Sequence, residues 1–408
     1  MTTEFEEGDS NGGVMPPRTA SLKPMSVGVV AAHADVTILV NPGDQGEQSR
    51  ASVLTGWKSA VEQGLRKQRV SDLAASPISP FDMTADLSAV RARVPDVVVG
   101  PSHLIGSAVR YGYTPVVMVD QPSRAVMVTM TSSDIGSFEQ SAGKRLGLPE
   151  QDSLVTYLIR GEATAANTTL KRQFSSIYQT RFQDALLICL QLRRCDVVAV
   201  ERVVFDRWVA AGNPVKVIME SHEAPGMSVA VKDDLKLNVD GLRSAIAEAM
   251  PGTVGAKPAA VTRDNFTYVS TLGYFTPRAL ANAKVVDANT VASMLRGKQG
   301  RYIDTRNKAE FNEGHVPGAT LIPYVEKSSK DPDFDAAVDE FHVARLGADK
   351  GALLIFGCNG AECWKSHKAS IAAIKAGYTN VAWFRGGVPE WRSAGLPIET
   401  GDPLVANP

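Results

Sequence analysis

The stretch LLIFGCNGAECWKS, residues 353–366, decides how the C-terminal part of this chain folds. An apolar run typical of a buried strand ends at Cys358, a short polar loop follows, and a helix is predicted to begin near Trp364. Cys358 is therefore expected where the carboxyl end of a strand meets the next helix, the edge at which parallel sheets bind ligands. Cys363, in the same loop, is one of only four cysteines in 408 residues, so the pair indicates thiol chemistry.

The surroundings of this loop favour a thiolate over a thiol. Loop N–H groups can converge into an anion-binding nest, and the following helix adds the positive end of its dipole. The thiolate is the nucleophile, so Cys358 could attack a sulfane sulfur, become a persulfide and pass the sulfur to an acceptor thiol. Lys365 is expected to pair with an anionic substrate or with the persulfide. Ser366 is expected to cap the helix or to donate to the substrate.

Two further segments accompany the cysteine loop. RYIDTRNKAEFNEGHVPGA (301–319) combines a strand, an Asp-x-Arg pair and a Gly-His-Val-Pro-Gly-Ala turn. VAWFRGGVPEWRSAGLPIE (381–399) combines a strand with a Gly-Gly pair and a Gly-Leu-Pro ending. We expect Asp304 and Arg306 to pair and hold the turn, and His315 to be a structural residue of that turn rather than a catalytic base.

In this order and at these spacings the three segments resemble the rhodanese (sulfurtransferase) family, over residues 284–400. The resemblance implies a rhodanese-like α/β domain, with Cys358 as the nucleophile directly after its strand. The loop departs from the usual family pattern and looks like a CxxCW-type loop with four residues between the cysteines instead of two. Lys365-Ser366 stands where the family commonly has Arg-Ser. This departure argues against plain thiosulfate:cyanide activity.

Several roles for the cysteine loop stay open at this point. Cys358 could carry the sulfur while Cys363 resolves it, or the two could cycle through a disulfide. The fold could also be a scaffold whose cysteines do no chemistry, or hold zinc through Cys358, Cys363 and His367. We predict neither a metal nor a cofactor. Cys189 and Cys195 are expected to be core residues.

The first 250 residues predict two α/β lobes, because buried strands alternate with helices and the pattern then restarts. VPDVVVGPSHLIGSAVRYGYTPVVMVD (94–120) and FQDALLICLQLRRCDVVAVERVVFDRW (182–208) resemble the phosphate/phosphonate family of type II periplasmic binding proteins. The resemblance implies a two-lobed clamshell that binds a small oxyanion and serves an ABC transporter. LVTYLIR (154–160) is predicted as a strand, and NTTLKRQFSSIYQ (167–179) as a helix capped by Asn167.

An anion site is predicted where two helices begin on opposite lobes, because a helix N-terminus can hold an oxyanion. On the first lobe Ser102 and His103 begin a helix. On the second lobe the candidates are Thr164, Asn167 and Thr168. The alternative is ordinary N-capping with no ligand. The loop 41–43, after the first strand, is a third candidate rim.

The predicted organisation starts with a leader and ends with a tail. The segments are 1–34 as a disordered leader or signal peptide, 35–250 as the two-lobed domain with a lobe boundary near 121–124 and a return to the first lobe near 225, 251–282 as a linker, 283–400 as the rhodanese-like domain and 401–408 as a tail. The leader holds basic residues, a short apolar patch and Ala32-His33-Ala34, which is the order of an export signal. We expect a periplasmic protein, or a cytoplasmic one if that segment is only a lead-in.

Composition narrows the partners. The formal net charge is −1, with 43 basic and 44 acidic residues, so no partner nucleic acid is indicated. No apolar stretch reaches the length of a membrane span. We therefore predict a sulfurtransferase acting through a Cys358 persulfide, fused to a small-oxyanion-binding domain, with a thiol acceptor. The alternative is a solute-binding protein for a phosphate/phosphonate-like or sulfur-containing anion, whose rhodanese-like domain is inert or a thiol-redox unit.

Overall fold

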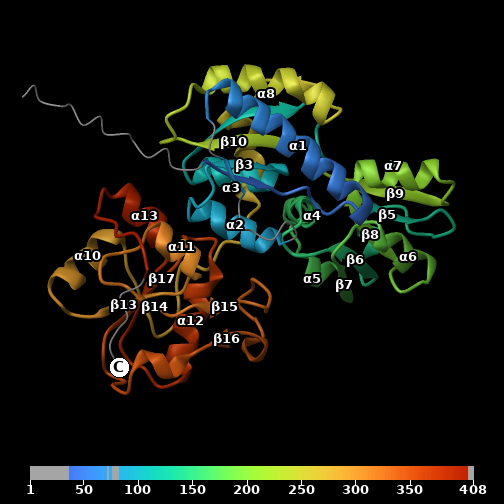
Figure 1. Cartoon of the computed structure of the whole chain (residues 1–408). Coiled ribbons are helices and arrows are strands. Elements are labelled where there is room, and N and C mark those ends of the chain that lie inside the picture. The colour runs from blue at the N-terminus through green and yellow to red at the C-terminus, as the bar shows by residue number, and fades with distance from the viewer. Residues whose placement is uncertain (1–35, 71–72, 76–81, 403–408) are drawn as a thin grey trace, which may run out of the picture. The chain divides into compact units, whose positions relative to one another are not determined.

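The computed structural model describes residues 36–70, 73–75 and 82–402 (Figure 1). The predicted leader 1–34 and most of the predicted tail, 403–408, lie outside the described residues. The described part contains one six-stranded, two five-stranded and one two-stranded sheet, with helices packed on them. The predicted α/β fold class is confirmed.

The first sheet is mixed rather than parallel throughout. Its strand order is β11 (Pro258–Ala259), β4 (Tyr113–Val119), β10 (Ser228–Lys232), β3 (Val97–Gly100), β1 (Val36–Val40) and β2 (Leu73–Ala75). β1 pairs in parallel with β2 and β3, whereas β10 runs antiparallel between β3 and β4. The chain thus leaves this sheet after Val119 and returns to it at Ser228.

Helices cover both faces of the first sheet. α1 (Glu47–Lys67) and α8 (Val239–Thr253) lie side by side on one face, and α2 (Met83–Arg91) and α3 (Ser102–Arg110) pack near the other (Figure 1). Alternate residues of a strand face opposite sides. Accordingly Val97 of β3 packs in the cluster with Trp57 and Ile246, and Val98 packs in the cluster with Leu104.

The second sheet has the order β7 (Ser176–Thr180), β6 (Arg145–Pro149), β8 (Val197–Glu201), β5 (Ala125–Met130) and β9 (Val215–Glu220). Its helices are α4 (Leu154–Ala165), α5 (Leu170–Gln173), α6 (Ala185–Gln191) and α7 (Arg202–Ala210), with the 3-10 turn η1 (Glu139–Ser141) before β6. These strands and helices form a second lobe, as the restart of the strand–helix alternation in the sequence predicts.

Two predictions for the second lobe are wrong. Residues 154–160 form the first half of helix α4 and not a strand, and the predicted helix 167–179 is the short α5 followed by β7. Residues 154–159 are all buried, so apolar periodicity could not separate a strand from a buried helix. The deciding signal is Ser153, whose side chain accepts a hydrogen bond from the Val155 N–H and caps α4.

The predicted linker 251–282 is also wrong over most of its length. β11 pairs with β4 in the first sheet, and η2 (Arg263–Phe266) and α9 (Thr267–Thr271) pack against α3. Phe266 and Val269 are buried in the core beside α3. Isolated apolar residues in a Pro- and Gly-rich segment gave too little periodicity to predict this packing.

The third sheet is parallel throughout, with the order β12 (Lys284–Val285), β18 (Val381–Phe384), β17 (Leu354–Gly357), β13 (Arg301–Asp304) and β14 (Thr320–Leu321). The helical segments around it are α10 (Ala288–Arg296), α11 (Lys308–Glu313), η3 (Ala336–Val338), η4 (Val343–Leu346), α12 (Trp364–Lys375) and α13 (Gly387–Ser393). A small hairpin joins β15 (Tyr324–Val325) and β16 (Glu340–Phe341). β17 ends directly before Cys358, so the cysteine loop lies at the carboxyl edge of this sheet.

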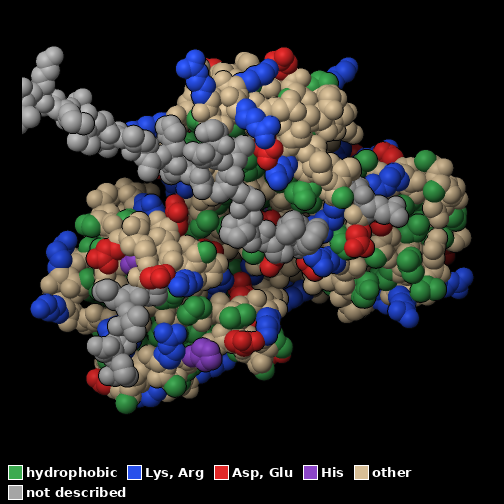
Figure 2. Space-filling view, viewed as in Figure 1, with side chains coloured by type: hydrophobic (Ala, Val, Ile, Leu, Met, Phe, Trp, Pro, Cys, Tyr) green, Lys and Arg blue, Asp and Glu red, His purple; other side chains and the backbone are tan. Residues whose placement is uncertain are grey.

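Surface charge is mixed on the face seen in Figure 2, where Lys and Arg side chains alternate with Asp and Glu. None of the helices in residues 36–70, 73–75 and 82–402 is long and apolar enough to cross a membrane.

Candidate functional site

Cys358 and Cys363 are joined by a disulfide in the loop between β17 and α12. Cys358 is 1% exposed and Cys363 is 5% exposed. The Val388 N–H donates to the Cys358 carbonyl at 2.9 Å. Gly387 has a φ of +57°, and a Cβ there would lie 2.1 Å from that carbonyl oxygen. Only glycine therefore fits this position, and the Gly-Gly pair after β18 holds the cysteine loop in place.

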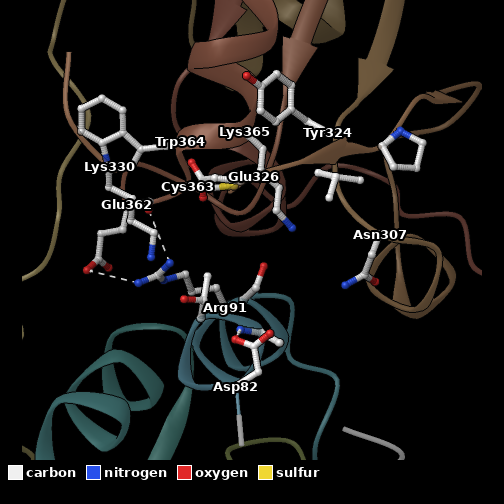
Figure 3. Close-up of a pocket in the computed structure, with 15 residues that line it drawn as sticks. Asp82, Arg91, Asn307, Tyr324, Glu326, Lys330, Glu362, Cys363, Trp364 and Lys365 are labelled. Carbon is white, nitrogen blue, oxygen red and sulfur yellow. Dashed lines mark hydrogen bonds and ion pairs between the residues drawn. The ribbon is translucent and has the colours of Figure 1, made fainter. Parts of the chain in front are cut away.

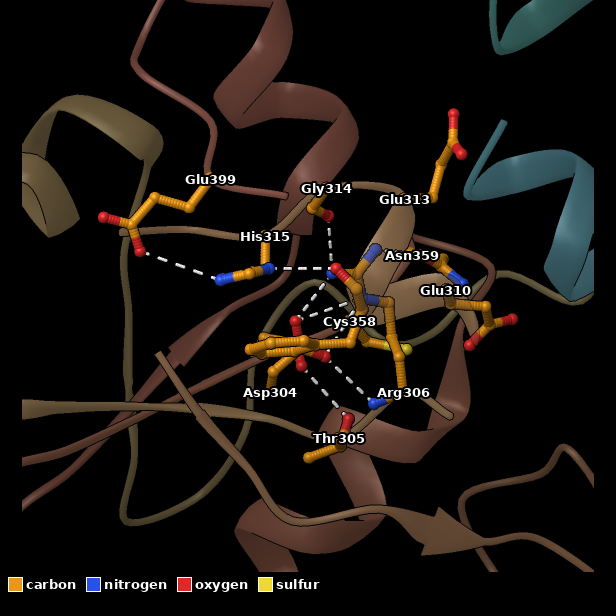
Figure 4. A network of polar contacts seen from close by, with 12 residues as sticks. Asp304, Thr305, Arg306, Glu310, Glu313, Gly314, His315, Cys358, Asn359 and Glu399 are labelled. Atoms are coloured by element: carbon orange, nitrogen blue, oxygen red, sulfur yellow. Dashed lines mark hydrogen bonds and ion pairs between the residues drawn. The ribbon is translucent and has the colours of Figure 1, made fainter. Parts of the chain in front are cut away.

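A buried ion pair supports the loop from below (Figure 4). Arg306 Nη2 lies 2.7 Å from Asp304 Oδ2, and both side chains are fully buried. The same guanidinium donates to the Gly314 carbonyl at 2.9 Å and to Asn359 Oδ1 at 3.3 Å. The pair thus connects β13 to the turn that contains His315 and to the residue after Cys358.

His315 is held by backbone and ring contacts. Its Nδ1 lies 2.9 Å from the Phe311 carbonyl oxygen, and its ring stacks on Phe311 with centroids 3.6 Å apart. Its backbone bridges to Glu399, and its Nε2 lies 3.7 Å from the Glu399 carboxylate (Figure 4). These contacts fasten the turn to the C-terminal segment.

Lys365 and Ser366, the two polar residues after the loop, differ in their exposure and in their contacts. Lys365 is 16% exposed and its Nζ lies 3.9 Å from Glu310 Oε2, a distance too long for a tight pair. Ser366 is buried, and its hydroxyl accepts a hydrogen bond from Trp383 Nε1 at 3.1 Å. Ser366 does not cap α12, whose N-cap is Cys363, so that part of the prediction is wrong.

His367 packs edge-on between Trp364 and Trp383. Burial lowers its pKa to about 4, so the ring is neutral at pH 7. Within the part of the chain that the structure describes, no three His, Cys, Asp or Glu side chains gather around a common metal position. The zinc alternative therefore has no ligand set in this loop.

A cavity of about 240 Å³ opens beside the disulfide (Figure 3). Cys363 lines it and Cys358 does not. Its walls come from both halves of the chain: Asp82, Thr84, Ala85, Ser88 and Arg91 from α2 and its N-cap, and Asn307, Pro323, Tyr324, Val325, Glu326, Lys330, Glu362, Cys363, Trp364 and Lys365 from the C-terminal half. Figure 3 shows the Lys365 side chain reaching into this space.

The predicted anion site in the first 250 residues is only partly assembled. Ser102 and His103 begin α3 and are buried, and His103 Nε2 lies 2.8 Å from the Asp152 carbonyl oxygen. Burial lowers the pKa of His103 to about 4. A helix N-terminus of the second lobe therefore does meet α3, but it is the start of α4 at Ser153 and not the segment predicted.

Thr164, Asn167 and Thr168 lie at the opposite end of α4. Thr164 is in its last turn, and Asn167 follows the helix with a φ of +56°. A helix of twelve residues is about 18 Å long, so these side chains are remote from Ser102. The position of these three residues was predicted wrongly because residues 154–160 were predicted as a strand, so the helix start was expected after this segment and not before it.

Two neighbouring cavities between the lobes were not predicted from the sequence. One of about 220 Å³ is lined by Pro42, Glu47, Arg50, Ala51, Leu54, Arg181 and Phe182, and one of about 40 Å³ by Asn41, Gly43, Asp44, Arg50, Met83, Thr84, Glu150, Asp152, Ser153 and Arg181. Arg50 and Arg181 border both. Of the predicted rims, only the loop 41–43 contributes. The two arginines are far apart in the sequence and carry no motif.

Charged side chains of both signs line the two cavities, and Arg50 and Asp152 are the buried ones among them. Burial, with the nearby charge of Arg181, lowers the pKa of Arg50. Burial raises the pKa of Asp86 to about 7 and that of Glu201 to about 7. Asn41 Nδ2 donates to Asp86 Oδ2 at 2.6 Å. Arg50 and Arg181 thus share the two cavities with the carboxyl groups of Asp44, Glu47, Glu150 and Asp152.

Comparison with known proteins covers both halves of the chain. Residues 287–394 match the family model of the rhodanese-like domain, and residues 82–263 match that of "ABC transporter, phosphonate, periplasmic substrate-binding protein". The chain is 35% identical over 114 residues to the chloroplastic thiosulfate sulfurtransferase 16 of Arabidopsis thaliana, which is 27% of this chain and 88% of that protein. The C-terminal domain belongs to the rhodanese-like family. The N-terminal domain is of the phosphonate-binding type.

Two other proteins are similar to parts of the chain. An HTH-type transcriptional regulator, Rv0324 of Mycobacterium tuberculosis, is 32% identical over 121 residues, 29% of this chain, and the chain spans about half of its length, 47%. A structure of PhnD1 from Prochlorococcus marinus in complex with methylphosphonate covers 58% of this chain and 96% of that one, at 13% identity and a TM-score of 0.47.

Two buried ion pairs join the rhodanese-like domain to the phosphonate-binding-type domain. Lys330 pairs with Asp152, and Arg91 Nη2 lies 3.7 Å from Glu362 Oε1, with all four side chains at most 7% exposed. Asp152 also borders the smaller lobe cavity. Lys330 and Arg91 both border the cavity beside the disulfide. Thr84 of α2 lines both cavities, so the two candidate sites adjoin at this helix.

Proposed function

We propose that the rhodanese-like domain is a sulfurtransferase in which Cys358 takes up sulfur and Cys363 releases it. The observation that carries the proposal is the pair of sulfurs, near enough to bond, between the carboxyl end of β17 and the N-terminus of α12. The positive end of α12 and the Lys365 ammonium group favour an anionic donor at this place. The resemblance over residues 287–394 agrees with this chemistry.

The proposed cycle balances with thiosulfate as the donor. The Cys358 thiolate attacks the sulfane sulfur, the S–S bond of thiosulfate breaks, and sulfite leaves with the electron pair. The Cys363 thiolate then attacks the Cys358 Sγ of the persulfide and expels hydrosulfide. This step leaves the Cys358–Cys363 disulfide, so an external thiol reductant must supply two electrons before the next turnover.

The test uses the reduced full-length protein, thiosulfate and intact-mass measurement. We expect Cys363→Ser to retain one added sulfur atom, because its persulfide has no resolving thiol. Wild type is expected to lose two hydrogen atoms as it closes the disulfide, with sulfite and hydrosulfide released. Cys358→Ser is the matched control and is expected to gain nothing. Sulfur retained on Cys358→Ser would contradict the assignment of Cys358 as nucleophile.

We further propose that the phosphonate-binding-type domain holds a small oxyanion, phosphonate-like or sulfur-bearing, between its lobes and presents it to an ABC transporter. Arg50, Arg181 and the start of α4 support this site. Methylphosphonate is expected to raise the melting temperature of wild type but not of Arg181→Met. The control is Arg66→Met, an exposed arginine on α1. An equal shift in both variants would exclude the cleft as the site.

The alternative function is solute binding with a rhodanese-like domain that is inert or only cycles its disulfide. It predicts a melting shift with methylphosphonate and no sulfur adduct on any variant.

We also propose a periplasmic location. Two disulfides support an oxidising compartment, since such bonds are rare in the cytosol. The test is the N-terminal residue of the protein purified from its own cells, which is expected near Asp35; an intact Met1 or Met15 start would contradict export.

A further inference from the structure

The phosphonate-binding-type domain covers the cysteine loop. Asn359 Nδ2 donates to the Ser88 carbonyl at 3.2 Å and to the Ser88 hydroxyl at 3.3 Å. Arg91 Nη1 donates to the Glu362 carbonyl at 3.4 Å. Gly360 packs under Tyr111, since a Cβ there would lie 2.9 Å from the Tyr111 hydroxyl. The end of α2 and the residue after α3 therefore lie directly over the loop that carries the disulfide.

Under this cover, a cavity of about 240 Å³ gives an approach to the disulfide, and Cys363 lines it whereas Cys358 does not (Figure 3). Thiol–disulfide exchange needs a thiolate in line with one sulfur, so access decides which sulfur is attacked. A protein thiol must bring its own surface to that sulfur. The 5% exposure of Cys363 and the packed α2 leave no room for such a surface.

The cavity carries charges of both signs. Arg91 is paired with Glu362, Lys330 with Asp152, and Glu326 with Lys368. Lys365, whose ammonium group lies 3.9 Å from Glu310 Oε2, is on one wall, and the exposed Asp82, whose carboxylate accepts from the Ala85 N–H, is on the opposite wall. An ammonium and a carboxylate facing one cavity complement a ligand that carries both a carboxylate and an ammonium group.

We propose that this cavity is the site where a small zwitterionic thiol reduces the disulfide, and that α2 excludes protein thiols from it. The thiolate attacks Cys363 Sγ, the Cys358–Cys363 bond breaks, and the electron pair stays on Cys358 as a thiolate. A second thiol then attacks the ligand sulfur of the mixed disulfide and frees Cys363. Two thiols become one small disulfide, and the protein regains its dithiol. The proposal rests on the proposed function only in taking this disulfide as a state of the working cycle.

The first test compares reductants on the oxidised full-length protein, with alkylation and peptide mass to follow Cys358 and Cys363. L-Cysteine is expected to open the disulfide at least about tenfold faster than reduced thioredoxin at equal thiolate concentration. In wild type, neutral 2-mercaptoethanol, with its rate corrected for its own thiolate fraction, is expected to react more slowly than L-cysteine. In Lys365→Gln the two reductants are expected to react at the same rate. Thioredoxin faster than L-cysteine would overturn the proposal.

The second test opens the cover. Arg91→Ala removes the contacts of α2 with Glu362, and the thioredoxin rate is expected to rise about tenfold while the L-cysteine rate changes little. Lys171→Ala, which removes an exposed ion pair between the same two domains, is the matched control and is expected to change neither rate. Equal thioredoxin rates in wild type and Arg91→Ala would show that α2 is not the barrier. Sulfur uptake by the reduced protein is measured separately, so its failure tests the proposed function alone.

Discussion

At the scale of single residues, Arg306 has the most demanding position among the charged groups of the rhodanese-like domain. It is fully buried, and its guanidinium group donates to Asp304 from Nε and Nη2, to the Gly314 carbonyl from Nη2 and to Asn359 from Nη1. Two buried charges cost desolvation energy that only complete pairing offsets. Removing one of them leaves the other buried without a counter-charge.

We therefore predict that Arg306→Ala lowers the free energy of unfolding of this domain by about 3–5 kcal/mol. Urea denaturation followed by tryptophan fluorescence measures the loss. Lys308→Ala is the control, because its ion pair with Asp402 is exposed on both sides and such pairs contribute about 0–1 kcal/mol. Equal midpoints for the two variants would be inconsistent with the role given to the buried pair.

Asp86 makes the stability of the phosphonate-binding-type domain depend on pH. Burial raises its pKa from 3.8 to about 7, so the folded state binds this proton more tightly than the unfolded state. The resulting stability is complete below the unfolded pKa and is lost as pH rises through the folded pKa. The affected window lies between about pH 4 and pH 7.

The melting temperature of wild type relative to Asp86→Asn is accordingly expected to fall between pH 5 and pH 8. The amide keeps a partner for Asn41 but cannot ionise. Glu201 shifts in the same direction and is present in both proteins, so the comparison isolates Asp86. Asp206→Asn, at an exposed position on α7, is expected to follow wild type. A constant difference between wild type and Asp86→Asn across this range would refute the prediction.

At the scale of elements, the two disulfides differ in what surrounds them. Cys189 and Cys195 link the end of α6 to the start of β8, and they pack in a core cluster with Leu186 and Val198. Their place in the core agrees with the sequence, whereas the bond between them was not predicted. Gly147 lies against this bond, since a Cβ there would be 2.8 Å from Cys195 Sγ.

We expect a mild thiol reductant to open Cys358–Cys363 well before Cys189–Cys195, because a cavity reaches Cys363 and the other pair is surrounded by packed side chains. Iodoacetamide labelling with peptide mass spectrometry at successive times gives the order. The unlabelled Cys189–Cys195 peptide serves as the internal reference. Label appearing first on Cys189 or Cys195 would contradict the accessibility argument.

At the scale of the whole molecule, the buried pair of Lys330 with Asp152 joins two domains that could otherwise unfold separately. Burial by itself would raise the pKa of the Asp152 carboxyl group. The charge of Lys330 outweighs this effect and lowers that pKa to about 2. Lys330→Met would leave that carboxylate without its main counter-charge in a buried place.

Calorimetry of the full chain is expected to show one transition in wild type and two in Lys330→Met, with the first shifted down by several degrees. The matched control is Lys171→Ala, whose pair with Asp331 also joins the domains but is exposed, and a single transition is expected there. One unchanged transition in Lys330→Met would mean that this pair does not couple the domains.

The features that depend on local order along the chain could be predicted from the amino-acid sequence. These are the rhodanese-like segments around Cys358, the return of the chain to the first lobe, which was predicted near residue 225 and occurs at Ser228, and the Asp304–Arg306 pair, whose members are two residues apart. A strand ending in a cysteine and a helix start are recognised from neighbouring residues alone. The segment 154–160 shows the limit, since a fully buried helix and a buried strand have the same apolar composition.

The contacts between residues far apart in the chain are known only from the folded structure. Arg50 and Arg181 come together between the lobes, and Arg91 meets the cysteine loop, over separations of more than a hundred residues. The folded structure also shows that Cys363, and not Cys358, lines the cavity. Such contacts depend on how buried surfaces pack and which charges they enclose, and a single sequence carries no periodic signal for either.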